Sequence, residues 1–143
     1  ASDENLATGN NTEFVDQPTA VTSLDGLMAK EKLPRVDFIR CDVEGAEIRF
    51  IEGGRNTIER DLPSLLIEIH PFSLQRNFSS SGEAVRDYFL NLGYRMWQLN
   101  DDNSHMHEST QIDPKRRWKD YFLIHPKRGK DLPEGMFRKA FGG

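Results

Sequence analysis

Apolar residues along the chain gather in short runs that predict strands, and these runs are separated by polar or helical segments. The run at 64–71 is nearly all apolar, and the apolar residues of the run at 36–43 point to both faces of the strand. Both patterns are typical of strands buried on both faces of a parallel sheet. The runs at 94–99 and 118–126 have no helical segment between them. We expect those two to pair antiparallel, as a terminal hairpin with a long polar loop.

Polar residues of the kind that cap helices precede two helical segments. Thr22 or Ser23 is placed to cap a short helix, and Ser80 and Glu83 have the spacing of a capping box. The second of these helices carries apolar residues at helical spacing and ends at Gly93, a good residue to terminate a helix. Both segments are therefore predicted to be helices.

The segment between the first two strands is helical in composition but contains a glycine pair. We expect Gly53 and Gly54 to break it into two short helices, since glycine weakens a helix interior. The segment 75–82 reads as a loop, and Pro71 should end the second strand. A helical turn is predicted near the end of the chain, bearing Met136, Phe137 and Phe141.

The predicted order is strand, helix, strand, helix, strand, strand, which indicates an α/β fold with parallel strands and a C-terminal antiparallel hairpin. We expect a single domain over residues 1–143. Its core should cover about 20–126, with 1–19 as a loop or arm and 127–143 as a tail.

Composition narrows the class of protein further. The 143 residues carry a formal net charge of −4, which argues against a nucleic-acid-binding protein. No apolar run approaches the roughly 20 residues of a membrane span. The one cysteine, Cys41, excludes an intrachain disulfide, and we expect a reducing, cytoplasmic location.

Charged residues crowd the ends of the first two predicted strands. Asp42 and Glu44 end the first, in the stretch "RCDVEGAE", and Glu68 and His70 end the second. Ligands of open α/β sheets bind beyond the carboxyl ends of the strands, so these side chains should meet in one crevice. A carboxylate or imidazole there could take a proton from a substrate hydroxyl, and together they could hold a metal ion.

Structural interpretations remain open for the same residues. Arg40 and Asp42 share a face of their strand and could simply pair, and Glu47 could favour the first turn of its helix through the helix dipole. His70 could be a hydrogen-bonded residue at a strand end. Glu68 lies in an apolar run, where an unpaired charge is costly, so it needs a partner or a function. For Glu44 the structural and the functional interpretations are equally open.

Weaker candidates lie elsewhere in the chain. His105 and His107 could bind a metal, although a solvated loop is the commoner structure. The segment 115–119, "KRRWK", could bind a phosphate or an acidic sugar, although a charged entrance to a strand is the commoner explanation. Trp97 and Trp118 could stack on a ligand but more often pack across a hairpin. Cys41 reads as a small core residue.

The stretch "VDFIRCDVEGAEIRFIEGGRNTIERDLPSLLIEIHP" resembles the FkbM-type methyltransferases. Their pattern places D-V-E-G-A-E after an apolar strand, followed by a helix, R-x-x-L and P-x-x-hydrophobic-E. Upstream "VTSLDGL" and downstream "LNLGYRMWQL" are similar to further family segments, so the resemblance spans about 20–126. Arg40 stands where the family commonly has Lys, which keeps the charge but changes its geometry.

The resemblance implies a Rossmann-like methyltransferase sheet and O-methyl transfer from S-adenosylmethionine to a small-molecule or glycan hydroxyl. We expect no nucleic-acid partner, in keeping with the net charge, and no metal at the site. The roles that the resemblance implies are catalytic for Asp42, Glu44 and His70, cofactor-binding for Asp42 and Val43, and substrate-binding for Arg40 and Glu68.

One part of the family pattern is missing. The only glycines ahead of residue 36 are Gly9 and Gly26, so there is no glycine-rich donor-binding loop. The resemblance therefore implies the C-terminal half of a methyltransferase domain, inactive alone, with an exposed sheet edge that a homo-oligomer or the N-terminal arm should cover. A non-catalytic binding domain derived from this fold stays open. So does a metal-dependent hydrolase using Asp42, Glu44, Glu68 and His70.

Overall fold

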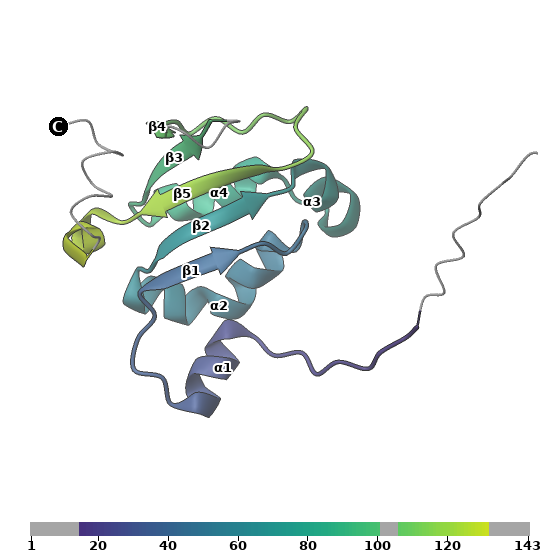
Figure 1. Cartoon of the computed structure of the whole chain (residues 1–143), viewed down its shortest axis with the longest axis vertical. Helices are drawn as coiled ribbons and strands as arrows, with labels where there is room; N and C mark the ends of the chain where they lie inside the picture. The colour runs from purple at the N-terminus through teal and green to yellow at the C-terminus, as the bar shows by residue number, and fades with distance from the viewer. Residues whose placement is uncertain (1–14, 101–105, 132–143) are drawn as a thin grey trace, which may run out of the picture.

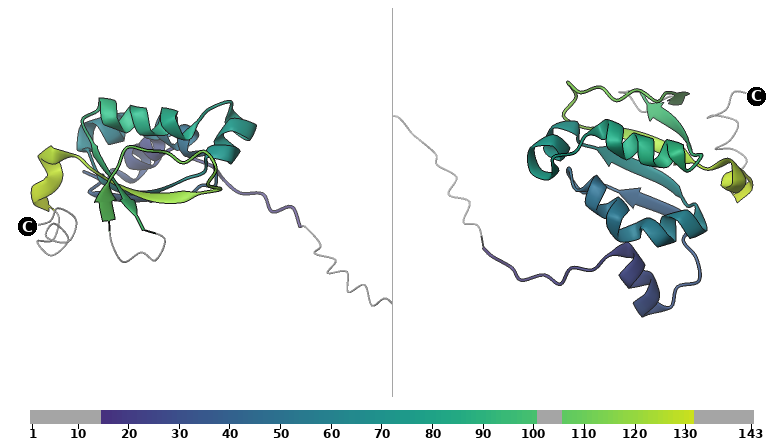
Figure 2. Two further views of the ribbon diagram at one scale, coloured as in Figure 1. Left: turned by 90° about the horizontal axis from the view of Figure 1, so that it is seen from above. Right: turned by 180° about the vertical axis from the view of Figure 1, so that it is seen from behind.

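The computed structural model describes residues 15–100 and 106–131. Their architecture is a five-stranded mixed sheet with α-helices on one side, in the strand order β1-β2-β5-β3-β4 (Figures 1 and 2). This arrangement is the Rossmann-like α/β class that the sequence predicts. The predicted turn near Met136 lies outside the described residues.

Strands β1 (Phe38–Cys41) and β2 (Ser64–Ile69) are parallel, with Cys41 beside Ile67. The prediction that both strands are buried on both faces is wrong for β1. Within the described residues β1 pairs only with β2, and Phe38 remains 51% exposed. Among the described residues the outer edge of β1 is therefore unpaired.

Helix α1 (Leu24–Glu31) packs against α2 (Glu47–Asp61). The expected cap of α1 is confirmed, because the Gly26 N–H donates to Ser23 Oγ at 3.0 Å. The expected break in α2 is wrong: one helix runs through Gly53 and Gly54. A Cβ added at Gly54 would lie 3.0 Å from Leu24 Cδ2, so this glycine permits the close approach of α1.

A helix replaces the predicted loop after β2. Helix α3 (Pro71–Phe78) begins directly at Pro71, where the missing N–H of proline costs nothing. Helix α4 (Gly82–Asn91) is capped by Ser81, whose Oγ accepts from the Ala84 N–H at 3.1 Å. The predicted Ser80–Glu83 capping box is therefore wrong by one residue.

The antiparallel pairing of the last two predicted strands is confirmed. Strand β5 (Lys119–Ile124) lies between β2 and β3 (Arg95–Leu99) and runs antiparallel to both. The polar loop between β3 and β5 contains a further short strand, β4 (Met106–Glu108), which pairs with β3. A 3-10 helix, η1 (Pro126–Asp131), follows β5.

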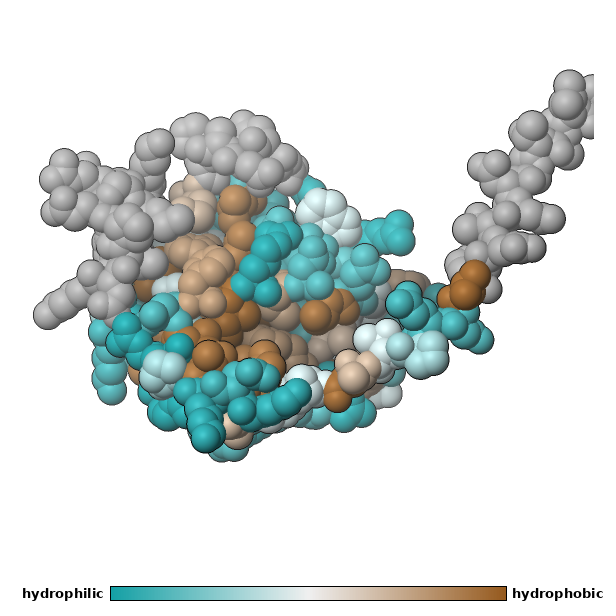
Figure 3. Space-filling view, turned by 60° about the horizontal axis from the view of Figure 1, so that its bottom comes forward, coloured by the Kyte–Doolittle hydropathy of each residue, from teal (hydrophilic) through white to brown (hydrophobic). Residues whose placement is uncertain are grey.

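The sheet has one face covered by helices and one face without them in the described residues (Figure 2). On the covered face, alternate strand residues such as Leu65, Ile67 and Leu123 form the main core with α2, α3 and α4. On the other face lies a smaller apolar cluster. It consists of Trp97, Phe122 and Ile124 with Leu66 and Met106 packed against them. The space-filling view in Figure 3 shows hydrophobic residues, in brown, gathered among the hydrophilic ones.

None of the helices within residues 15–100 and 106–131 is long and apolar enough to cross a membrane.

Candidate functional site

The carboxyl ends of β1 and β2 bring three of the predicted site residues together. Because the two strands are parallel and in register, Asp42 leaves β1 at the level of Glu68 on β2. One ligand atom from each of Asp42, Glu68 and His70 lies within 4.8 Å of the other two. We call these three residues the strand-end group.

Hydrogen bonds hold the strand-end group in place. His70 Nε2 lies 2.6 Å from Glu68 Oε1, and the two side chains are only 9% and 15% exposed. Glu68 therefore has the partner that its place in an apolar run requires. Asp42 is more open and accepts a hydrogen bond from Arg40 Nη2 at 3.2 Å, as the strand spacing predicts.

A tight turn separates the group from α2. Glu44 has φ 49° and Gly45 has φ 109°, both in the left-handed region. A Cβ at Gly45 would lie 2.3 Å from the Ser73 Cβ, so the turn packs directly against α3. Glu44 is exposed and lies outside the strand-end group, although the resemblance gives it a catalytic role.

Glu47 lies beneath this turn and is fully buried. Its Oε1 accepts the Gly45 N–H at 2.8 Å, while its Oε2 is buried with no hydrogen-bond partner. Burial raises the pKa of this carboxyl, and the backbone N–H groups of Gly45 and His70 only partly oppose the rise. Glu47 thus ties the turn to the helix, a structural contribution beyond the dipole effect expected from sequence.

Cys41, at the end of β1, is a core residue as predicted. Its side chain is 3% exposed. Burial, reinforced by the negative charges of Glu47 and Asp42, raises the pKa of the thiol to about 12. A thiol so hard to ionise is not a nucleophile at neutral pH.

The neighbouring strand β5 adds an acid that sequence reasoning missed. Asp120 lies directly opposite Glu68 in the antiparallel ladder, so both side chains are on the face without helices. Its Oδ1 is buried without a hydrogen-bond partner. The alternation of Trp118, Asp120 and Phe122 along β5 was the available signal, because it places an acid on an otherwise aromatic face.

Val43, predicted to contact the methyl donor, is 40% exposed and borders a hollow of about 460 Å³. The lining is Val21, Thr22, Ser23, Leu24, Val43, Ala46, Arg49, Phe50 and Gly53. The only charged group there is Arg49, which hydrogen bonds to Glu52 at 2.8 Å. The lining contains no carboxylate that could accept hydrogen bonds from a ribose.

The strand-end group could also hold a cation. Two carboxylates and an imidazole are ligands that suit borderline divalent metals such as Mn²⁺ or Zn²⁺. This is the one such group within the described residues. The other predicted metal candidate is untested, because His105 lies outside them, while His107 is exposed with Nδ1 3.2 Å from Asn100 Oδ1.

The acids and the imidazole lie at the carboxyl ends of parallel strands, beyond which ligands of open α/β sheets bind. A model of the FkbM methyltransferase domain family matches residues 2–96, so the chain belongs to that family. The match covers the N-terminal part of the chain and ends within β3, whereas the resemblance was expected over 20–126. No curated protein and no solved structure matches the chain.

Proposed function

We propose that this chain supplies the acceptor side of an S-adenosylmethionine-dependent O-methyltransferase. The observation that carries the proposal is the meeting of Asp42, Glu68 and His70 at the ends of two parallel strands in an FkbM methyltransferase domain. Such a group is suited to a hydroxyl acceptor, whose proton must leave when its oxygen gains a methyl group.

His70 is the proposed general base. Glu68 Oε1 lies 2.6 Å from His70 Nε2. In the tautomer with a proton on Nε2, that bond orients the ring and leaves Nδ1 to accept the hydroxyl proton. Glu68 then stabilises the imidazolium that forms. Asp42, paired with Arg40, is placed to orient the acceptor at the open side of the group.

The donor-binding part of the proposal places the glycine-rich loop outside these 143 residues. Two observations support it: the hollow beside Val43 has no carboxylate, and only two glycines precede residue 36. The exposed edge of β1 is where further strands of such a sheet could pair.

Calorimetric titration of the purified chain with S-adenosylmethionine, beside its mass in solution, tests the donor-binding part. We expect no binding at millimolar ligand. Micromolar binding would show that the chain, alone or as a dimer, builds a complete donor site, and would overturn the assignment of the donor loop to another segment.

The acceptor side is tested with a polypeptide that joins this chain to a glycine-rich donor loop. The measurement is its rate of methyl transfer. Loss of a general base costs about 10²–10⁴-fold in rate, so His70→Gln should lower kcat by that amount. The control is Glu31→Gln, which removes a half-exposed acid from α1 and should leave kcat unchanged. Full activity in His70→Gln would contradict the role of His70.

A further inference from the structure

A basic cluster lies beside the strand-end group, although the chain as a whole carries a net charge of −4. Its five residues come from α3, from the segment before β5 and from the first position of β5. The cluster consists of Arg76, Lys115, Arg116, Arg117 and Lys119.

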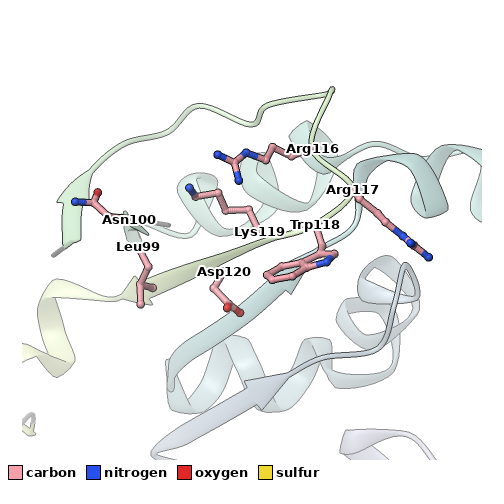
Figure 4. Close-up of a pocket in the computed structure, with 7 residues that line it drawn as sticks. All are labelled: Leu99, Asn100, Arg116, Arg117, Trp118, Lys119 and Asp120. Atoms are coloured by element: carbon pink, nitrogen blue, oxygen red, sulfur yellow. The ribbon is translucent and has the colours of Figure 1, made fainter. Parts of the chain in front are cut away.

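Two hollows give the cluster a concave surface. The first, of about 460 Å³, lies between α3 and the segment before β5. The second, of about 450 Å³, shares Arg116 and Arg117 with it and extends to Asp120. In Figure 4, Arg116 and Lys119 point the same way from one side of β5, while Trp118 and Asp120 lie on the other. The first hollow is lined by Phe72, Ser73, Arg76, Asn77, Pro114, Lys115, Arg116 and Arg117.

The lining of the first hollow is basic. It contains four cations and no acid. Within residues 15–100 and 106–131, Arg76, Lys115 and Arg117 form no ion pair. Like charges gathered in one hollow repel each other, and an anion bound among them removes that repulsion. Ser73 and Asn77 add neutral hydrogen-bonding groups to the same wall.

The first hollow is also close to the proposed base. Phe72 and Ser73 lie in the first turn of α3, directly after His70, and Ser73 packs against the Gly45 turn. Trp118 directly precedes β5. The first residue of β5, Lys119, pairs with Ile69 at the end of β2. Phe72 is 61% exposed, so the lining of the first hollow also offers an apolar ring surface.

We propose that the methyl acceptor carries an anionic group, a phosphate or a carboxylate, which Arg76, Lys115 and Arg117 bind while the acceptor hydroxyl reaches His70. The hollow is large enough for an anionic group with an adjoining ring. This inference names the substrate class of the proposed methyltransferase and rests on that function.

Calorimetric titration of the full chain at low salt, with inorganic phosphate and separately with acetate, tests the anion site. No donor and no turnover are needed, so failure here is distinguishable from failure of the proposed function. We expect saturable binding of one anion. Arg76→Gln and Lys115→Gln should each weaken it at least about tenfold, since each removes a charged hydrogen bond. The matched control is Lys30→Gln on α1, whose side chain is 79% exposed, and it should leave binding unchanged.

The two probes separate the two sources of negative charge. Tighter binding of phosphate identifies a phosphorylated acceptor, and tighter binding of acetate identifies a carboxylate acceptor. The proposal is overturned if neither anion saturates the protein at millimolar concentration. It is also overturned if Lys30→Gln weakens binding as much as Lys115→Gln, because the effect would then be general screening.

Discussion

Substitution of Gly45 by alanine should disrupt the turn that leads from β1 into α2. Gly45 has φ 109°, a conformation that side chains of L-residues rarely adopt, and forcing it costs about 1–3 kcal/mol. The new Cβ would also lie 2.3 Å from the Ser73 Cβ, and overpacking of this kind costs about 1–3 kcal/mol more. We expect a loss of about 3 kcal/mol in the free energy of unfolding.

Urea and thermal unfolding measure this loss. A domain of this size loses about 2–4 °C in Tm for each kcal/mol, so Gly45→Ala should melt about 10 °C below the parent chain. The double variant Gly45→Ala with Ser73→Gly separates the two causes. It removes the Cβ–Cβ collision but keeps the strained φ, so its loss should be smaller than the sum of the two single losses by about 1 kcal/mol or more.

A small effect would refute the reasoning. If the free energy of unfolding of Gly45→Ala lies within about 0.5 kcal/mol of that of the parent chain, the turn is neither strained nor in close contact with α3. The close packing of this turn would then not be what holds the strand-end group in position. If instead the loss of the double variant equals the sum of the two single losses, backbone strain alone accounts for the effect of Gly45→Ala and the contact with Ser73 contributes nothing.

Three further substitutions test contacts that support the fold. Tyr94→Phe removes the buried hydrogen bond from Tyr94 Oη to the Pro63 carbonyl, 2.8 Å long, and should cost about 1 kcal/mol in urea unfolding. A hydrogen bond from Arg60 lowers the pKa of Asp61 in the folded chain below its ordinary 3.8. The ionised Asp61 therefore stabilises the fold above pH 3.8, and this stabilisation is lost as the pH falls through the lower pKa of the folded chain. Asp61→Asn should therefore flatten the loss of stability with acid in pH-dependent unfolding, and a slope identical to that of the parent would contradict this. Asp25→Ala removes the carboxylate that accepts backbone N–H groups of α2, and limited proteolysis should then cut α1 faster than in the parent chain.

Much of the fold follows from local patterns in the sequence. The apolar runs predicted the ends of β1, β2, β3 and β5 to within about two residues. They could do so because a buried strand needs a continuous or alternating apolar pattern. Ser23 capped α1 as expected, because its hydroxyl satisfies a backbone N–H three residues ahead. The errors came where the tertiary structure reversed a local preference. Gly53 and Gly54 weaken a helix in isolation, yet α2 stays intact because α1 packs on them.

For the site, the sequence by itself determined which chemistry is present and where in the strands it falls. The acids of "RCDVEGAE" and the Glu-x-His at the end of β2 were readable because polar groups stand out at the ends of apolar runs. Only the tertiary structure decided which of them meet. Parallel register joins Asp42 to Glu68 and His70, whereas the left-handed turn leaves Glu44 exposed outside that group. Likewise Arg76 joins Lys115 and Arg117 only because α3 and the segment before β5 line one hollow, and side chains so distant in sequence become neighbours only through the packing of the folded chain.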